Sequence, residues 1–441
     1  MTMRIPSSAA LLLAIAACSG GTAAPVAGPA PAGAASSASA ALANGLRIAE
    51  RFHVDAISTR RFTHAELWSA LAPALASPAL GTRQIGASIL GRPIRAVTFG
   101  RGPTTVLLWS QMHGDESTAT MSLADILRFL AEGEGDPLRE RLARELTVTF
   151  VPMLNPDGAE LFQRENAIGI DVNRDGRRRV TPEARALKAL RDSLNPRFGF
   201  NLHDQGARTR VGERGVQAGI ALLAPAHDST RGYDAVRSRA RLVAATMAGV
   251  LGGAIPGRVA KYDDSFNPRA FGDLMQQWGT STVLIESGAL PGDPQKQRLR
   301  ALNVAAILAA LDAIATGSYA AADPDAYERL PFNTGGANDL LVTGGQVVLP
   351  GRPPIAADLA INYDDAVART GGRLREVGDL RAVIAIDTLD VAGLYLHPAA
   401  PAITTRGEGQ WLRIGAVAAF DIRRGPDPAS ELVRRIGASD R

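Results

Sequence analysis

A histidine and a glutamate, His113 and Glu116, stand three residues apart in a short polar stretch that could hold a metal ion. The stretch follows the apolar run 106–110, which predicts a buried strand because consecutive apolar residues leave no face for solvent. Apolar residues at helical spacing follow, so we expect both side chains in a strand-to-helix loop. Imidazole nitrogen and carboxylate oxygen are ligands that zinc accepts, commonly with a water completing the site. The alternative is a solvated loop with an incidental histidine and glutamate.

Two further groups of the same kind follow apolar runs elsewhere in the chain. Residues 198–202 form a run that ends at His203, and residues 283–285 form one that ends at Glu286. In an open α/β sheet, ligands bind in the crevice beyond the carboxyl ends of the strands. Separate parts of the chain thus place four acid or imidazole groups in the same way, just past the carboxyl end of a strand. This common placement predicts one shared site.

A layered framework is needed to bring these groups together. Apolar patterning predicts strands at 105–110, 146–152, 198–202 and 281–286, alternating with helices at 117–132, 182–193, 234–250 and 294–316. This alternation predicts the α/β class with a mixed, mostly parallel, doubly wound sheet. Before it, Thr63 is expected to cap a helix, and residues 85–94 and 95–99 to form two strands around the Gly91-Arg92-Pro93 turn.

The 441 residues divide into four expected segments. Residues 1–18 resemble a bacterial lipoprotein signal peptide with a lipobox that ends at Cys18, and plain secretion is the alternative. Residues 19–44, rich in Ala, Gly, Pro and Ser, predict a flexible tether. Residues 45–325 are expected to form the α/β domain, and 330–441 a small all-β accessory domain. A lipid anchor at Cys18 would place the protein in the bacterial envelope, on the periplasmic side or in the outer membrane.

The composition argues against several other classes of protein. It is 46% hydrophobic and 21% charged with a net charge of +4, which is ordinary for a globular protein. The densest basic stretch, Arg174 to Arg179, is as compatible with a solvated loop as with nucleic acid, and no nucleic-acid-binding signature accompanies it. We therefore expect no nucleic acid partner.

Cys18 is the single cysteine, so no internal disulfide can form. No segment after residue 18 is expected to be long and apolar enough to span a membrane.

Taken together, the motifs resemble the zinc carboxypeptidase family, the carboxypeptidase A-like metallopeptidases. The resemblance covers roughly residues 60–315 and follows the family's order. Its elements are His113-x-x-Glu116, Asn155-Pro156-Asp157-Gly158, Arg164, Asp171-x-Asn173-Arg174, His203 and Glu286. The helical His-Glu-x-x-His motif of thermolysin-type enzymes is a different pattern.

The resemblance implies a metal centre and a proton carrier. His113, Glu116 and His203 would hold one Zn²⁺, with a water in the open position. Glu286 would take the proton from that water and later deliver it to the leaving amine. The Asn-Pro-Asp-Gly stretch is expected to be a structural turn that aims the strand after it.

The resemblance also implies substrate contacts. Arg164 would steady the oxyanion, and Asn173 and Arg174 would bind the terminal carboxylate of the substrate. Tyr262 is the candidate for the tyrosine that covers the substrate, with a packing role as the alternative. Asp204, directly after a predicted ligand, would either orient a histidine or cap a turn.

The expected function is that of a zinc-dependent metallocarboxypeptidase, which hydrolyses the peptide bond next to a free C-terminal carboxylate. A zinc amidase that acts on murein peptides or N-acyl amino acids is an alternative. A non-catalytic peptide-binding lipoprotein is an alternative of another class. Separately, the stretches 339–348, 357–361 and 376–380 resemble the small β-sandwich of dihydroorotase-type amidohydrolases, without that family's barrel or His-x-His motif.

Overall fold

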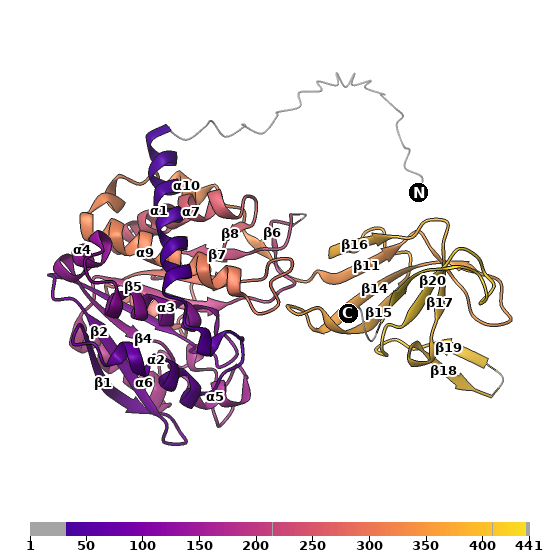
Figure 1. Ribbon diagram of the computed structural model, residues 1–441, viewed down its shortest axis with the longest axis horizontal. Coiled ribbons are helices and arrows are strands. Elements are labelled where there is room, and N and C mark those ends of the chain that lie inside the picture. The colour runs from indigo at the N-terminus through magenta and orange to yellow at the C-terminus, as the bar shows by residue number, and fades with distance from the viewer. Residues whose placement is uncertain (1–31, 214, 408, 438–441) are drawn as a thin grey trace, which may run out of the picture.

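The structure is a computed structural model that describes residues 32–213, 215–407 and 409–437 (Figure 1). An α/β region extends to the short helix α10 (Asp325–Glu328), and a β-rich region follows it. The predicted signal peptide, with Cys18, lies outside the described residues.

One eight-stranded sheet forms the centre of the α/β region, with strand order β1-β2-β4-β3-β5-β9-β7-β8. Its four central strands, β4, β3, β5 and β9, run parallel, while β1, β2 and the β7–β9 pair add antiparallel contacts. The predicted mixed, mostly parallel sheet is therefore confirmed. The strands are β1 (Leu80–Ala87), β2 (Pro93–Phe99), β3 (Thr104–Ser110), β4 (Leu146–Val151), β5 (Phe198–Asp204), β7 (Ile220–Leu223), β8 (Val259–Lys261) and β9 (Ser281–Ser287).

Helices cover both faces of this sheet, which explains why its central strands are apolar throughout. On β3, Val106 and Leu108 enter one core, whereas Leu107 and Trp109 enter the other. The helices of the first core are α1 (Ala32–Arg51), α2 (His64–Leu75), α3 (Thr118–Glu132), α4 (Pro137–Glu145), α7 (Ala235–Ala254) and α9 (Gln297–Thr316). Those of the second core are α6 (Pro182–Leu194) and α8 (Phe271–Gln277). All eight predicted alternating elements are present.

Two local predictions at the start of the region have different outcomes. Thr63 caps α2 as expected, because its hydroxyl accepts from the Glu66 N–H at 3.2 Å while the Glu66 carboxylate accepts from the Thr63 N–H at 2.7 Å. Two strands joined by a turn are present as predicted, as the antiparallel pair β1 and β2, but the predicted bounds 85–94 are wrong. The β1 strand ends at Ala87, and residues 88–92 form a turn that is closed by the Ser88 N–H donating to the Arg92 carbonyl at 2.8 Å.

The tether predicted for residues 19–44 is wrong over residues 32–44, which belong to α1. Leu42 and Leu46 of this helix pack against the first core. Gly45 lies so close to α9 that a Cβ there would be 2.4 Å from the Ala305 Cα atom. Alanine favours helices, and small residues permit this close approach, so a composition that is typical of a linker serves here as a packing surface. Residues 19–31 lie outside the described residues.

Helix α9 corrects the expectation about membrane spans. It has 20 residues and a window of mean hydropathy 1.6, which is long and apolar enough to cross a membrane by length and composition. In this fold 78% of that window is buried, and α9 packs against α1, α3 and α7. A core helix that is covered on all sides needs the same apolar composition as a membrane span.

The β-rich region contains two main sheets with strand orders β15-β14-β11-β16 and β13-β12-β17-β20-β21, and a small β18–β19 pair. Its core contains Val342, Leu359, Leu396 and Phe420. The predicted β-rich character is confirmed, while the resemblance to amidohydrolases stays a prediction. The strands are β11 (Asn338–Thr343), β12 (Gln346–Val347), β13 (Ile355–Ala356), β14 (Asp358–Asp365), β15 (Thr370–Gly378), β16 (Ala385–Asp390), β17 (Tyr395–Pro398), β18 (Ile403–Arg406), β19 (Gly409–Leu412), β20 (Phe420–Arg423) and β21 (Leu432–Ile436).

The two regions are held together by a strand pair and by ion pairs. In the connection between them, β10 (Asn333–Thr334) pairs with β6 (Arg210–Val211) of the α/β region. Beyond the connection, Arg208 donates to the Asp339 carboxylate at 2.9 Å. The Arg60 guanidinium pairs with Asp365 at 2.6 Å.

Candidate metal centre and active-site cavity

Two adjacent parallel strands place His203 beside Glu286. Strands β5 and β9 pair in a register that sets His203 opposite Glu286, and neighbouring strands lie about 4.8 Å apart. Because side chains alternate along a strand, Leu202 and Ile285 enter the first core while His203 and Glu286 point to the opposite face of the sheet. The apolar runs that predicted these strands therefore also fix the two polar groups next to each other.

The loop after β3 brings His113 and Glu116 to the same place. Gln111 has a positive φ of 49°, and its side-chain amide donates to the Gly114 carbonyl at 2.9 Å. Gly114 lies directly on the backbone of α5 (Pro156–Leu161), and a Cβ there would be 2.0 Å from the Gly158 carbonyl carbon. The position between the two candidate ligands therefore requires a residue without a side chain.

The Asn155-Pro156-Asp157-Gly158 stretch is structural, but it starts the helix α5 where a strand was expected to follow. Asn155 caps this helix by accepting from the Gly158 N–H at 2.9 Å, and Pro156 occupies the first turn. The buried Asp157 carboxylate accepts from the Ser88 hydroxyl at 2.8 Å, which ties the β1–β2 turn to α5. The stretch therefore braces the loop that carries His113.

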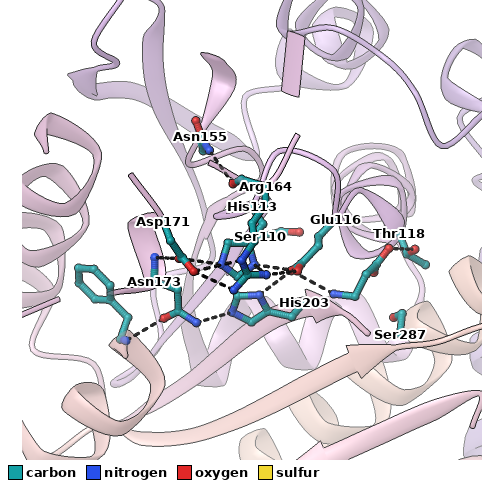
Figure 2. Close-up of polar contacts among 12 residues, drawn as sticks. Ser110, His113, Glu116, Thr118, Asn155, Arg164, Asp171, Asn173, His203 and Ser287 are labelled. Carbon is teal, nitrogen blue, oxygen red and sulfur yellow. Dashed lines mark hydrogen bonds and ion pairs between the residues drawn. The ribbon is translucent and has the colours of Figure 1, made fainter. Parts of the chain in front are cut away.

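His113, Glu116 and His203 form a compact buried cluster (Figure 2). One ligand atom of each lies within 4.8 Å of the other two. The Glu116 carboxylate lies between the rings, with Oε1 at 2.7 Å from His113 Nδ1 and Oε2 at 2.6 Å from His203 Nδ1. Two imidazole nitrogens and one carboxylate oxygen form a known ligand set of catalytic zinc sites, so the donors that are present fit Zn²⁺.

Asp171 connects this cluster to Arg164 (Figure 2). Its Oδ1 lies 3.0 Å from His113 Nε2, and its Oδ2 accepts from Arg164 Nε at 3.1 Å and Nη2 at 2.9 Å. A carboxylate behind a metal-binding histidine fixes the orientation and tautomer of the ring. Arg164 Nη1 also donates to Glu116 Oε1 at 3.3 Å, so the guanidinium lies at the edge of the cluster. Asp171 belongs to the predicted motif, but no role was predicted for it from the sequence.

Burial and neighbouring charges shift the pKa values of the cluster. Burial acts to lower the pKa of His113, but the Glu116 carboxylate and then Asp171 outweigh it and raise this pKa to about 9. Burial lowers the pKa of His203. Burial acts to raise the pKa of Glu116, yet the two imidazoles hold it well below its ordinary value. The cluster thus favours an ionised carboxylate between the rings, which is the form that binds a cation.

Glu286 and Tyr262 have shifted pKa values as well. Burial raises the pKa of Glu286 well above its ordinary value, and the nearby Glu116 carboxylate acts in the same direction. A carboxyl group with a raised pKa is suited to accept and return a proton near neutral pH. The Glu286 carboxylate, together with burial, raises the pKa of Tyr262 to about 12, so its phenol keeps its proton as a hydrogen-bond donor.

All eight predicted site residues line one cavity of about 550 Å³. They are His113, Glu116, Arg164, Asn173, Arg174, His203, Tyr262 and Glu286. The cavity is also lined by residues that were not predicted, among them Gln205, Thr209, Asp273 and Asn333. Gln205 and Thr209 follow a ligand closely in sequence, which is a usable signal, whereas Asn333 stands in a Pro- and Gly-rich connection without any such signal.

Asn173 and Arg174 belong to one wall of this cavity. The Phe271 N–H donates to Asn173 Oδ1 at 2.9 Å, and Asn173 Nδ2 lies 3.4 Å from His203 Nε2. The Arg269 guanidinium donates to the Arg174 carbonyl at 3.2 Å. The amide and guanidinium that were predicted to bind a carboxylate are therefore held beside the cluster by the segment that starts α8.

Asp204 does not orient a histidine. Its carboxylate accepts from the Thr118 hydroxyl at 2.6 Å and from Lys296 Nζ at 2.9 Å. Its backbone N–H donates to Glu116 Oε2 at 3.2 Å. Asp204 thus links the end of β5 to the starts of α3 and α9, and supports Glu116 through its main chain.

Comparisons with known proteins agree with the predicted family. Residues 74–207 match the family model described as zinc carboxypeptidase. This stretch contains His113, Glu116, Arg164 and His203, and it ends before Tyr262 and Glu286.

Two curated relatives that match are named carboxypeptidases. Carboxypeptidase 2 of Trichophyton rubrum is 28% identical over 109 residues, which is 24% of this chain and 20% of that protein. Carboxypeptidase SOL1 of Arabidopsis thaliana is 28% identical over 98 residues, 21% of this chain and 20% of that protein. A solved metallo-carboxypeptidase from Burkholderia cenocepacia shares 20% identity with a TM-score of 0.46, over 58% of this chain and 70% of its own. The chain thus spans about a fifth of the curated relatives' length. Residues 74–207, less than half of the chain, are therefore similar to the zinc carboxypeptidase family.

Proposed function

We propose that this protein is a zinc-dependent metallocarboxypeptidase that hydrolyses the peptide bond next to a free C-terminal carboxylate. One observation carries the proposal. His113, Glu116 and His203 converge within 4.8 Å, and the register of β5 and β9 sets Glu286 directly beside His203. Three ligands of this kind next to a carboxyl group with a raised pKa are the parts that metal-assisted hydrolysis of an amide requires.

His113, Glu116 and His203 would hold one Zn²⁺. When bound, zinc would polarise the carbonyl to be cleaved and lower the pKa of its water to about 7. Glu286 would accept a proton from the attacking water and return it to the leaving amine nitrogen. The raised pKa of Glu286 suits both transfers, because the group is neither too weak a base nor too weak an acid near neutral pH.

The remaining predicted residues would bind the substrate. The Arg164 guanidinium would stabilise the negative charge that develops on the carbonyl oxygen, and Asp171 holds it at the edge of the cluster for this purpose. Asn173 and Arg174 would bind the terminal carboxylate, which suits a planar guanidinium next to an amide donor. The protonated Tyr262 phenol would donate a hydrogen bond to the bound peptide.

The proposal is tested on the soluble protein lacking residues 1–18. Zinc content and release of C-terminal amino acids from a mixed peptide library are measured for the wild type, Glu286→Gln and a control, Glu183→Gln. Glu183 is also a buried carboxylate, but it binds the Ile89 N–H at 3.2 Å and does not line the cavity. We expect about one zinc per chain in all three proteins. Only the Glu286 variant is expected to lose cleavage.

The other outcomes separate the alternative functions. If the wild type binds zinc but cleaves no library peptide, the proposed peptide specificity is refuted. That result would favour an amidase that acts on murein peptides or N-acyl amino acids. Absence of zinc binding would refute the ligand assignment and favour a peptide-binding protein without catalysis.

We further propose that the protein is anchored by a lipid on Cys18 in a bacterial envelope. The support is the sequence pattern of residues 1–18. The full chain and its Cys18→Ala variant are compared by membrane fractionation and intact-mass measurement. A lipid adduct and membrane association are expected only for the wild type, and equal soluble fractions would refute the anchor.

A further inference from the structure

The connection to the β-rich region forms part of the cavity wall. Residues 331–334 run between β6 and β8, and both edges of the segment are hydrogen-bonded. The N–H groups of Gly212 and Lys261 donate to carbonyls of this segment at 2.7 and 2.8 Å, and β10 pairs with β6. Asn333 and Gly335 line the same cavity as the candidate metal ligands. A residue far from the family motifs in sequence is thus fixed at the candidate active site.

The hydrogen bonds around Asn333 define which of its polar atoms faces which partner. Gln205 Nε2 donates to the Glu286 main-chain carbonyl at 3.4 Å, and Asn333 Nδ2 donates to Gln205 Oε1 at 2.8 Å. Because a carbonyl can only accept, Gln205 must present its nitrogen to Glu286 and its oxygen to Asn333. Asn333 must then present its nitrogen to Gln205. Its Oδ1 accepts no hydrogen bond from any residue that the structure describes.

The position of Asn333 relative to the cluster indicates which part of a bound peptide would lie near its Oδ1 atom. Asn173 contacts the His203 ring at 3.4 Å, whereas Gln205, just beyond the end of β5, contacts the Glu286 carbonyl on β9 at 3.4 Å, so the two residues belong to different walls of the cavity. The first wall carries the groups proposed to bind the terminal carboxylate. A peptide held there, with its scissile carbonyl at the metal cluster, would continue toward Gln205 and Asn333 with the residues on the amino side of the cut.

We propose that Asn333 is a substrate-binding residue whose Oδ1 accepts a main-chain N–H on the amino side of the cleaved bond. The inference rests on the proposed function and adds a requirement to it. The preferred substrates are peptides with at least one amide N–H before the scissile bond, in addition to their free C-terminus. The connection to the β-rich region thereby takes part in the selection of substrate.

The test compares Asn333→Ala with Thr334→Ala, the neighbouring residue on β10, which does not line the cavity. Each protein is assayed with an acylated tripeptide and with versions N-methylated at each amide on the amino side of the cut. Loss of one neutral hydrogen bond should raise KM about threefold to tenfold in Asn333→Ala, with kcat nearly unchanged. With the wild type, methylation of one of these amides should raise KM by the same factor. With Asn333→Ala, the same methylation should raise KM little further.

A second measurement separates this inference from the proposed function. Zinc-loaded Glu286→Gln, with and without Asn333→Ala, is titrated with the unmethylated peptide. Weaker binding of the double variant supports the inference, and equal binding overturns it. A fall in kcat with unchanged KM would also overturn it, since that result means that Asn333 acts only through Gln205 on the strand that carries Glu286. If Glu286→Gln binds no peptide at all, the proposed function itself fails and the inference falls with it.

Discussion

The close contact between Gly114 and α5 gives the sharpest prediction about the metal centre. In Gly114→Ala, the new Cβ would lie 2.0 Å from the Gly158 carbonyl carbon, 2.3 Å from the Ala159 nitrogen and 2.4 Å from the Gly158 oxygen. All three are backbone atoms, so no side chain can rotate away. An ordinary contact begins at 3.4 Å, so the loop or the helix must move by about 1.4 Å.

The displacement falls on the segment that carries two of the three proposed ligands. His113 and Glu116 flank Gly114, and each meets its partners within about 3 Å. Overpacking of this kind costs about 1–3 kcal/mol of stability, and a shift of about 1 Å in a catalytic geometry can cost about 100-fold in rate. We therefore expect Gly114→Ala to fold with reduced stability, to bind zinc at least about tenfold more weakly and to lose about 100-fold in peptidase activity.

Zinc affinity is measured by competition with a chelator, peptidase activity with the best library substrate, and stability by urea unfolding. The matched control is Gly252→Ala in α7, where nothing lies within 4 Å of the new Cβ. That variant should keep its zinc affinity and gain up to about 1 kcal/mol, because alanine favours a helix over glycine. If Gly114→Ala binds zinc as tightly as the wild type does, the contact with α5 does not position the loop that carries His113 and Glu116.

Three other perturbations test separate parts of the fold. Burial raises the pKa of Asp273 to about 6, so the folded state loses stability as the pH rises from about 4, where the unfolded carboxyl ionises, to about 6, and this penalty then stays constant. Asp273→Asn should therefore gain up to about 2 kcal/mol at pH 8 and nothing below pH 4, and a pH-independent effect in urea unfolding would contradict this. Asp171→Asn should weaken zinc binding about 10- to 100-fold by releasing His113 Nε2, and unchanged affinity in the chelator competition would contradict that role. Gly45→Val should cost about 2 kcal/mol by pushing α1 away from Ala305, and an unchanged melting temperature would mean that this helix contributes little to stability.

The sequence predicted which residues gather in one cavity, because strands determine most of the geometry there. The apolar runs before His203 and Glu286 located β5 and β9, and parallel pairing then sets the two side chains opposite each other. The spacing of His113 and Glu116 on one loop similarly limits how far apart they can lie. The positions of these four groups follow from local pattern and from the rules of parallel sheets.

The remaining features depend on contacts between distant parts of the chain. Asn333 reaches the cavity through main-chain pairing with β6 and β8, and nothing in the sequence around it indicates those partners. Residues 32–44 were misassigned because Ala, Gly and Ser are common in linkers. Their role in packing depends on the close contact between α1 and α9 at Gly45, which the sequence does not indicate. The turn predicted at Gly91-Arg92-Pro93 spans residues 88–92 instead, because its anchor, Asp157, lies on another element.

The burial of α9 at the centre of the first core also has a consequence for synthesis on the ribosome. Helices α1, α3 and α7 pack against α9, but all three are translated before it. Gly45 must wait for Ala305 to emerge before the contact between α1 and α9 can form. Until residue 316 has left the exit tunnel, the nascent chain exposes apolar helix faces that chaperones bind and that promote aggregation. A chain that terminates early would therefore lack the helix that covers those faces. Chaperones and proteases would then recognise it as unfolded.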